Sequence, residues 1–389
     1  MILLDYPYVS DFLLDTIEEF GLPVVATDSA KKLAGNRRVN WIPEVAAVNE
    51  LRTNPHPTLY TNSENSIAWI QQNAPESELA DRIQIFKNKF EFRTLMQEIY
   101  PELFHLAVAL EELKDIDPSQ LSFPLVMKPS VGFFSLGVHR VNHLYGWQSA
   151  VQQIQEEMEQ ARSMYPREVI DSTQILLETY IPGEEYAFDC YFDGAGNPVL
   201  LNVLKHTFSS EQDVGDRIYS SSPALIIGMH KPILDFLHLL GSKVELRNFP
   251  LPIEIRRDKG KIYPIEVNPM RFGGFCTTAD LTWFSYGINS YLHFLRGLKP
   301  VWEDILPPIS DKIFSLILLD NQAKINPEDL CHFDYDGLLA DFEKPLHLRK
   351  TELDKFGVFG FLFTETSLGN EKELNEILQS DLKKYIRLQ

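Results

Sequence analysis

Residues 251–275 read LPIEIRRDKGKIYPIEVNPMRFGGF, and this stretch predicts a β-hairpin. Two runs of alternating apolar and polar residues flank Asp258-Lys259-Gly260, a combination typical of a hairpin turn. The alternation places four apolar side chains on one face, suited to a core: Ile253, Ile255, Ile265 and Val267. The opposite face carries four polar side chains: Glu254, Arg256, Glu266 and Asn268.

The polar face of this hairpin holds two carboxylates. With a three-residue loop centred on Gly260, Glu254 lies directly opposite Glu266, with Cβ atoms roughly 4.5–5.5 Å apart. Two carboxylates so close repel each other unless a cation lies between them. Together with the Asn268 amide they offer the hard oxygen ligands that suit Mg²⁺ carried in with substrate phosphates. The alternative is an exposed hairpin whose carboxylates point into water.

The residues after the hairpin favour the metal interpretation. Arg271 offers a guanidinium suited to two parallel hydrogen bonds with phosphate or carboxylate. Gly273 and Gly274 follow, and a glycine pair lets the backbone approach a ligand closely. The whole stretch therefore predicts a binding site for an anion and its metal.

Length, composition and charge limit the class of protein. A chain of 389 residues is too long for one core and predicts about two to four domains. The hydrophobic fraction of 44% and the charged fraction of 23% are those of an ordinary globular protein. The formal net charge of −19, without a basic cluster, argues against nucleic acid or an anionic membrane as partner. An anionic ligand must therefore meet locally placed Lys and Arg.

Cysteine usage and the apolar runs predict a cytoplasmic protein. The three cysteines are far apart and form no Cys-x-x-Cys arrangement, which fits a reducing compartment: Cys190, Cys276 and Cys331. The N-terminus has no positive segment ahead of its apolar residues, and runs such as 314–319 are too short to span a bilayer.

The N-terminal part predicts a βαβ unit. Residues 2–4 form an apolar strand, and Ser10 or Asp11 can cap a helix that ends at Gly21. Residues 24–27 form a second strand, which implies a right-handed crossover and a parallel sheet. No glycine fingerprint follows the first strand, so a dinucleotide site has little support there. Helical spacing returns over residues 85–99, where Tyr100-Pro101 ends it.

The strand over residues 123–128 delivers Lys128 to a loop. The loop contains Gly132, Ser135 and Gly137, and a second strand returns after it. Glycine lets backbone N–H groups converge on an anion and lysine adds charge, so the loop could cradle phosphates. A purely structural role for Lys128 is the alternative, and the pattern is not that of a Walker P-loop.

Two glutamates follow a polar helix predicted over residues 145–164. Glu178 ends a strand over 174–180, and Glu185 begins a second strand after a Pro-Gly turn. Their carboxylates could accept hydrogen bonds from an adenine amine or from ribose hydroxyls, although each could equally be a surface residue.

The polar segment 209–222 could be a substrate loop, because it combines hydroxyls with both signs of charge. His206 precedes it and could act there or simply be hydrogen-bonded, while Asp216 and Arg217 could instead pair with each other. Helices are predicted over 232–240 and 285–295. Strands over 312–319 and 358–364 and a helix over 371–385 then predict a small C-terminal α+β lobe.

Taken in order, these segments resemble the ATP-grasp superfamily, in which two α+β lobes clamp ATP after an N-terminal βαβ domain. The resemblance covers residues 85–300. It implies a mixed α/β and α+β fold with an N-terminal α/β domain at 1–84, an ATP-grasp domain at 85–304 with its lid at about 122–180, and the C-terminal lobe at 305–389.

The resemblance also implies roles for particular residues. Lys89, with Lys87 as its competitor, and Lys128 match the phosphate-binding lysines, and Ser135 lies in the phosphate loop. Glu178 matches the adenine hinge and Glu185 the ribose-binding glutamate. The Mg²⁺ ligands correspond to Glu254, Glu266 and Asn268. Arg271 matches the arginine that holds the transferred phosphoryl group, and His206 could assist it.

This chain departs from the family pattern at two places. Its loop has Phe133 and Phe134 where glycine is usual, which puts the loop's grip on phosphate in question. Met270 intervenes in the commoner Asn-Pro-Arg form, so Arg271 stands one residue further along.

The activity implied by the resemblance is carbon–nitrogen ligation. ATP with two Mg²⁺ ions, or Mn²⁺, would activate a small carboxylic acid, in the first place an amino acid, as an acylphosphate that an amine then attacks. The alternatives are an ATP-grasp kinase of a small molecule and an ATP-binding regulatory protein without turnover. The carboxylase branch has less support because no biotin-carrier segment is present. The resemblance is compatible with a homodimer.

Overall fold

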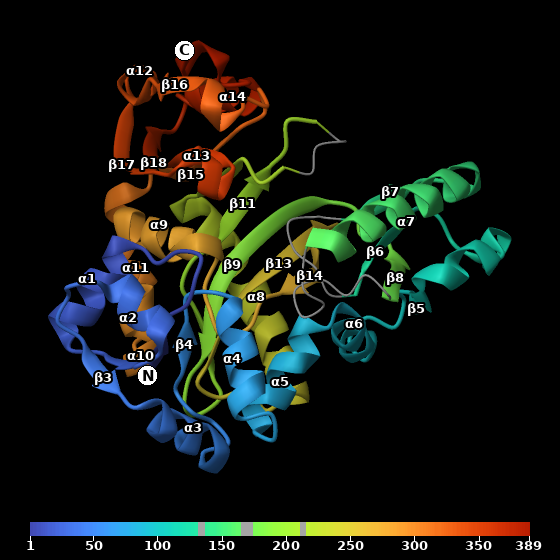
Figure 1. Ribbon diagram of the computed structural model, residues 1–389, viewed down its shortest axis with the longest axis horizontal. Helices are drawn as coiled ribbons and strands as arrows, with labels where there is room; N and C mark the ends of the chain where they lie inside the picture. Colours follow the sequence, from blue (N-terminus) through green and yellow to red (C-terminus); the bar gives the residue numbers. More distant parts are fainter. Residues whose placement is uncertain (131–136, 165–173, 211–214) are drawn as a thin grey trace.

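The computed structural model describes residues 1–130, 137–164, 174–210 and 215–389 (Figure 1). Strands within these residues form an N-terminal sheet of four, a second sheet of four, a sheet of nine and a two-stranded ribbon. The expected mixture of α/β and α+β structure is confirmed.

The N-terminal sheet is parallel, as the βαβ prediction requires. Its order is β3-β2-β1-β4, and every neighbouring pair is parallel. The first helix is capped as expected: the Ser10 hydroxyl accepts from the Leu13 N–H, and Gly21 ends the helix at φ 59°. The elements of this part are β1 (Ile2–Leu3), α1 (Asp11–Phe20), β2 (Pro23–Val25), α2 (Asp28–Ala34), β3 (Asn40–Ile42), α3 (Glu44–Thr53), β4 (Tyr60–Thr61) and α4 (Asn65–Asn73).

The predicted helix over 85–99 is two helices, α5 (Glu78–Lys87) and α6 (Lys89–Gln97). The helix is interrupted at Asn88, whose side-chain oxygen accepts hydrogen bonds from the N–H groups of Phe90 and Glu91. An asparagine cap satisfies the first donors of a new helix, so one residue both ends α5 and begins α6. Lys89 therefore stands at the first position of α6.

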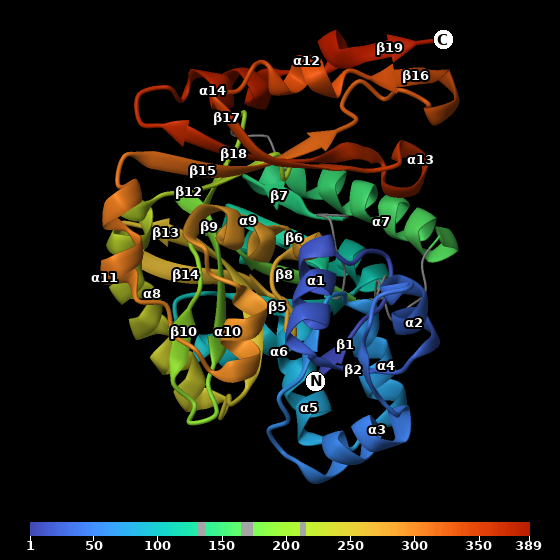
Figure 2. The same cartoon turned by 90° about the vertical axis from the view of Figure 1, so that its left-hand side faces the viewer.

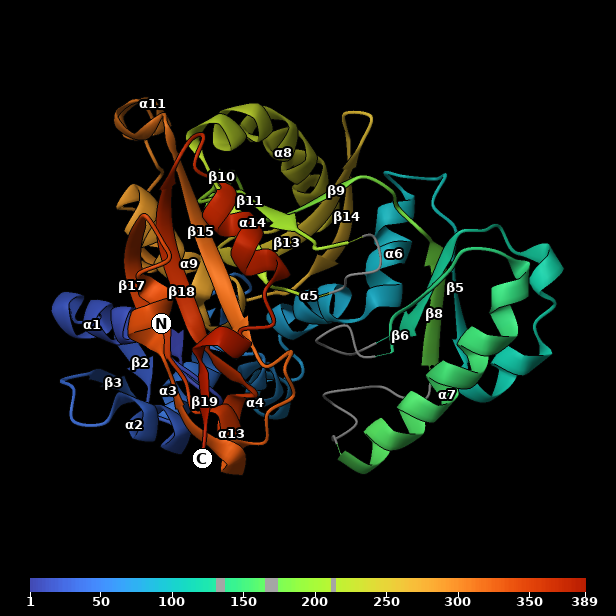
Figure 3. The same ribbon diagram turned by 90° about the horizontal axis from the view of Figure 1, so that it is seen from above.

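The second sheet has the order β5-β8-β6-β7 and is antiparallel. Trp147, Ile154 and Met158 of α7 pack with its strands in a core of their own. Figure 3 shows this sheet and α7 to one side of the rest of the chain. Gly132, Phe133, Phe134 and Ser135 lie outside the described residues. The elements are β5 (His105–Ala109), β6 (Leu125–Pro129), β7 (His139–Val141), α7 (Trp147–Met164) and β8 (Gln174–Thr179).

The nine-stranded sheet runs β14-β13-β9-β11-β12-β15-β18-β17, with β10 also paired to β9. Because Ile218 of β12 pairs with Ile317 of β15, the C-terminal strands extend the central sheet (Figure 2). The strands are β9 (Glu184–Phe192), β10 (Pro198–Leu200), β11 (Leu204–Thr207), β12 (Ile218–Ser221), β13 (Phe249–Asp258), β14 (Lys261–Val267), β15 (Lys312–Asp320), β17 (Lys344–Lys350) and β18 (Val358–Ser367). Part of the predicted substrate loop 209–222 is thus strand β12.

The helices and the short strands of this half complete the fold. They are α8 (Pro223–Lys243), α9 (Thr277–Tyr286), α10 (Ser290–Arg296), α11 (Trp302–Ile305), β16 (Leu330–Phe333), α12 (Tyr335–Leu339), α13 (Leu353–Phe356), α14 (Lys372–Gln379) and β19 (Ile386–Leu388). The predicted helix over 285–295 is wrong as one element, because Gly287 ends α9 at φ 66° and α10 follows. The predicted terminal helix over 371–385 stops early, at Gln379.

Helix α8 begins well before the predicted start at Pro232. Ser222 caps it, Pro223 stands at its first turn, and it passes through Pro232. The carbonyl that Pro232 leaves without an N–H partner belongs to Gly228, which is exposed. By length and composition α8 could cross a membrane, but it packs on β10 and β14, and Ile233 and Leu237 are fully buried.

Candidate functional site

The β13–β14 hairpin places Glu254 directly opposite Glu266, as predicted. The turn is one residue shorter than expected, since Asp258 pairs with Lys261. A bulge compensates for it: Ile255 pairs with Pro264, which leaves Ile265 as the extra residue.

The bulge also changes which residues face the core. Ile262 and Pro264 are buried and Ile265 is only half-buried, so the prediction that Ile265 shares the core face was wrong. Ile253, Ile255 and Val267 are buried as predicted.

The carboxylate pair is electrostatically asymmetric. Lys89 Nζ lies 3.0 Å from Glu266 Oε1. Burial alone would raise the pKa of Glu266, but the charges of Lys89 and Lys128 lower it. Burial and the facing Glu266 charge hold the pKa of Glu254 well above its usual range. Asn268 follows the end of β14, two residues beyond Glu266, and its side-chain amide has no hydrogen-bond partner among the described residues. The group offers three side chains with oxygen ligands, and only one of its two carboxylates pairs with a lysine.

Lys128 and Glu178 form a second, fully buried ion pair. Lys128 Nζ lies 2.6 Å from Glu178 Oε1, and Arg93 Nε lies 2.5 Å from the other carboxylate oxygen. Burial opposes ionisation, but the two cations lower the pKa of Glu178 to about 2. Burial lowers the pKa of Lys128, and the positive charge of Arg93 adds to this effect. Both partners of the pair are thus held inside the protein rather than at its surface.

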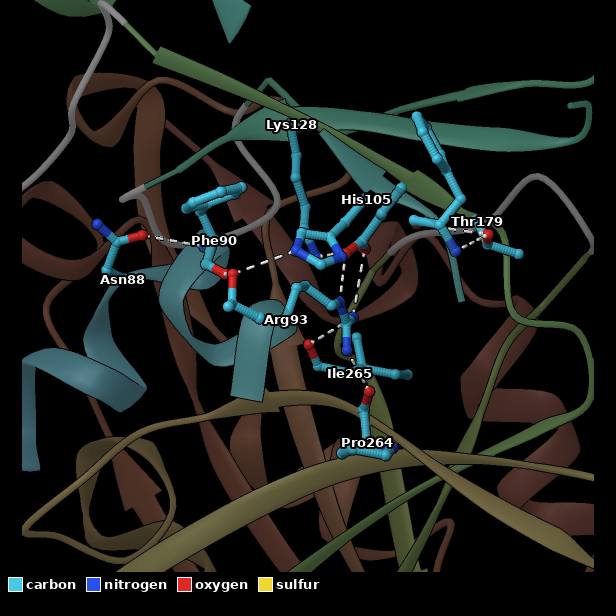
Figure 4. Close-up of polar contacts among 11 residues, drawn as sticks. Asn88, Phe90, Arg93, His105, Lys128, Thr179, Pro264 and Ile265 are labelled. Atoms are coloured by element: carbon cyan, nitrogen blue, oxygen red, sulfur yellow. Dashed lines mark hydrogen bonds and ion pairs between the residues drawn. The ribbon is translucent and has the colours of Figure 1, made fainter. Parts of the chain in front are cut away.

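Sequence reasoning did not single out Arg93, although it forms part of this cluster (Figure 4). One signal was available: Arg93 lies four residues after Lys89, so both project from the same face of α6.

Glu185 is held by a histidine and an arginine side chain. His206 Nδ1 lies 2.9 Å from one of its oxygens, and Arg256 donates to the other from Nε at 3.1 Å and Nη2 at 3.0 Å. Burial opposes the effect, but these contacts lower the pKa of Glu185. His206 Nε2 faces the Gly215 carbonyl at 3.1 Å, and its ring stacks on Tyr219. Both ring nitrogens are engaged, so His206 orients Glu185 in this arrangement.

Arg271 reaches back to the N-terminal part of the chain. Its Nη2 donates to Glu64 Oε1 at 2.9 Å, and its Nη1 donates to the Phe272 carbonyl at 2.9 Å. Glu64 also pairs with Lys87, and these two cations lower its pKa to about 2 despite burial. Of the two competing lysines, Lys89 pairs with the hairpin residue Glu266, whereas Lys87 pairs with Glu64.

The loop after the hairpin has an uncommon backbone. Met270 and Phe275 have φ of 71° and 54°. Residues with side chains rarely adopt positive φ, because it brings their Cβ atoms close to the backbone. The Gly273 N–H donates to Asp189 Oδ1 at 3.0 Å and to Thr278 Oγ1 at 2.8 Å. A Cβ at Gly273 would lie 2.3 Å from the Thr278 methyl carbon, so only glycine fits there. The surroundings thus fix this strained loop.

A C-terminal strand fastens the same loop. Arg349 of β17 donates to the Phe275 carbonyl at 2.5 Å and to Asp280 Oδ2 at 2.5 Å. The other Asp280 oxygen accepts from the Ser10 hydroxyl at 3.1 Å, and burial raises the pKa of Asp280 to about 6. Residues from three distant parts of the chain meet here.

Some candidates from the sequence are not part of this assembly. Arg217 does not pair with Asp216; it pairs with Asp320 and donates to the Ile377 carbonyl, while Asp216 accepts from the Tyr219 hydroxyl. Within the residues that the structure describes, no three His, Cys, Asp or Glu side chains form a metal cluster, so the candidate Mg²⁺ ligands are two carboxylates and one amide.

Comparison with known proteins identifies the fold. Residues 121–279 match the family model described as an ATP-grasp domain. No curated protein matches the chain in sequence.

Solved structures match over the whole chain. An L-amino acid ligase from Bacillus licheniformis is 20% identical with a TM-score of 0.68, and the match covers 100% of this chain and 98% of that one. Biotin carboxylase from Campylobacter jejuni is 13% identical with a TM-score of 0.63, covering 100% and 91%. N5-carboxyaminoimidazole ribonucleotide synthetase from Thermotoga maritima is 12% identical with a TM-score of 0.62, covering 100% and 99%. At these identities the likeness establishes the architecture.

Proposed function

Because this chain has the ATP-grasp fold, we propose that it is an ATP-dependent ligase that joins a small carboxylic acid to an amine. The observation that carries the proposal is a pair of lysines at the hairpin: the half-buried Lys89 pairs with Glu266, and the buried Lys128 pairs with Glu178. Lysine binds phosphate oxygens as a compact positive charge, so both side chains are suited to receive phosphates. An amino acid is the first acid to test, since the matching Bacillus licheniformis structure is an L-amino acid ligase.

The hairpin residues fit a divalent cation. Glu254, Glu266 and Asn268 would hold Mg²⁺ or Mn²⁺, with two ions expected, and the raised pKa of Glu254 supports a missing positive charge there. When bound, the metal neutralises charge on the phosphate oxygens.

The lysines bind nucleotide by exchanging partners. Lys89 and Lys128 would turn from Glu266 and Glu178 to the phosphates of ATP, which leaves Glu266 available as a metal ligand. Glu178 and Glu185 then face the adenine amine and the ribose hydroxyls as acceptors.

The reaction proceeds in two displacements. An oxygen of the substrate carboxylate attacks the γ-phosphorus, its bond to the bridging oxygen breaks, and ADP leaves. The amine nitrogen then attacks the acyl carbon, the bond to the phosphate oxygen breaks, and the amine loses a proton to solvent. Arg271 steadies the negative charge that develops, and His206 contributes by orienting Glu185.

The proposal also divides the chain into three domains. Residues 1–84 form the N-terminal domain, 85–304 the ATP-grasp domain with a lid at about 122–180, and 305–389 the C-terminal lobe. The separate apolar core of the lid sheet supports this division. The substrates are small molecules in the cytoplasm.

The test is release of ADP and phosphate from Mg-ATP in the presence of pooled amino acids and small carboxylic acids. We compare the native protein with Glu266→Gln and with Glu365→Gln, whose glutamate also pairs with a lysine, Lys344 at 2.6 Å, but lies in β18. If the protein is the proposed ligase, ADP and phosphate are released only when the pool is present. This release is lost in Glu266→Gln and persists in Glu365→Gln.

Other outcomes would contradict the proposal. ADP without free phosphate indicates a kinase. ATP binding in a calorimeter without release indicates a regulatory protein, and absence of ATP binding refutes the nucleotide site.

A further inference from the structure

Arg93 connects two sheets that otherwise belong to different parts of the fold. It lies on α6, it is 4% exposed, and it donates to Glu178 of β8 from Nε at 2.5 Å and from Nη2 at 3.4 Å. Its Nη1 donates to the Pro264 carbonyl at 2.6 Å and its Nη2 to the Ile265 carbonyl at 3.0 Å. Figure 4 shows Arg93 between Lys128 and these two residues of β14. One guanidinium thus joins the antiparallel four-stranded sheet, β5-β8-β6-β7, to the nine-stranded sheet.

The two carbonyls that Arg93 binds lie at the bulge of β14. The register passes from Glu254–Glu266 to Ile255–Pro264, and Ile265 has no residue opposite it. A bulge interrupts the ladder and leaves backbone groups in need of another partner. Arg93 supplies that partner to the residue immediately before Glu266. It therefore fixes the backbone that sets Glu266 against Glu254.

Arg93 also binds the carboxylate of Glu178, which forms an ion pair with Lys128 as well. When Lys128 turns to a phosphate, Glu178 loses one of its two charged partners. A buried carboxylate without a partner is strongly unfavourable, and Arg93 prevents that state. The planar fork of arginine can serve the carboxylate and both carbonyls at once, whereas lysine cannot.

We propose, on the basis of the proposed function, that Arg93 is a positioning residue that couples nucleotide binding by the lid sheet to metal binding by the Glu254–Glu266 pair. It holds Glu178 while Lys128 moves and holds Glu266 in the register that a cation needs. The gain in ATP affinity that Mg²⁺ provides therefore depends on Arg93.

The experiment measures ATP binding by calorimetry with Mg²⁺ and with EDTA. The variants are Arg93→Met and Arg93→Lys. The matched control is Arg217→Met, because the Arg217 side chain is 3% exposed and likewise serves one carboxylate, Asp320, together with backbone carbonyls, none of which belongs to the candidate site. The informative quantity is the ratio of the two affinities, which a general loss of stability leaves unchanged.

We expect the native protein to bind Mg-ATP more tightly than metal-free ATP. Arg93→Met should weaken Mg-ATP binding about 10- to 100-fold and bring the ratio close to one. Arg93→Lys, which still pairs with Glu178, should keep metal-free binding and lose most of the Mg²⁺ gain. Arg217→Met should keep the native ratio.

Two results would overturn the inference separately from the proposed function. Folded Arg93 variants that keep the native ratio refute the coupling, and so does an equal change of ratio in Arg217→Met. If Arg93→Met does not fold, Arg93→Lys decides by the same ratio. Failure of the native protein to bind ATP refutes the proposed function, and this inference with it.

Discussion

Replacing Glu254 with glutamine should stabilise the metal-free protein and abolish ATP turnover. Glu254 and Glu266 face each other across β13 and β14, with Cβ atoms roughly 5 Å apart. At an effective dielectric constant of about 20, two charges at that distance repel by about 3 kcal/mol. Lys89 offsets part of this repulsion through Glu266, so we expect a gain of about 1–3 kcal/mol in the free energy of unfolding at pH 8.

The gain should depend on pH in a defined direction. The pKa of Glu254 is raised in the folded state, so the native protein binds more protons than the unfolded chain and loses stability as pH rises above about 4. The glutamine variant lacks this loss. Its advantage should be small near pH 4, grow with pH and level off above the folded-state pKa.

Differential scanning calorimetry without metal, between pH 4 and 8.5, tests this reasoning. Glu266→Gln is the informative comparison, because it deprives Lys89 of its partner and should destabilise by up to about 3–5 kcal/mol while also abolishing turnover. A Glu254→Gln variant that is less stable than the native protein at pH 8, or whose advantage does not grow with pH, would refute the account of the pair.

Three further substitutions test other contacts. Lys128→Met should weaken Mg-ATP binding about 10- to 100-fold in a calorimeter, since a charge-assisted hydrogen bond to phosphate is lost; unchanged affinity would exclude it from the nucleotide site. Gly273→Ala should force its new methyl against Thr278, cost about 1–3 kcal/mol in thermal unfolding and reduce ADP release. Gly274→Ala, where nothing lies within 4 Å of the added carbon, is its control, and equal effects would contradict the packing argument. Asp280→Asn should destabilise by about 3–5 kcal/mol, because its arginine partner would stay buried without a counter-charge, and a thermal scan close to native would contradict this.

The hairpin shows what alternation along a strand can predict. Glu254 and Glu266 face each other as expected because the shorter turn and the bulge cancel in the register. The bulge itself displaced Ile265 from the core face, and its only local signal was Pro264, which cannot donate to a ladder. Alternation of apolar and polar residues predicts the buried face of a strand only as far as a bulge, where an extra residue shifts the alternation.

Contacts between distant segments were beyond local patterns. Arg93 binds Glu178 and Pro264, which lie 85 and 171 residues away. A pair between Arg217 and its neighbour Asp216 was one of the alternatives from the sequence, but tertiary packing brings Asp320 to Arg217 instead. The sequence indicated which residue types gather at the site, whereas the arginines that organise them became visible only in three dimensions.

The pairing of β12 with β15 limits how this protein can be divided or recombined. Removing residues 305–389 would leave the N–H and C=O groups of Ile218–Ser221 as an open sheet edge, which another molecule could extend into an aggregate. A chimaera that exchanges this lobe must reproduce the register of Ile218 with Ile317 and return an arginine to the position of Arg349. The lobe is therefore structurally bound to the rest of the chain and cannot be exchanged as an independent unit.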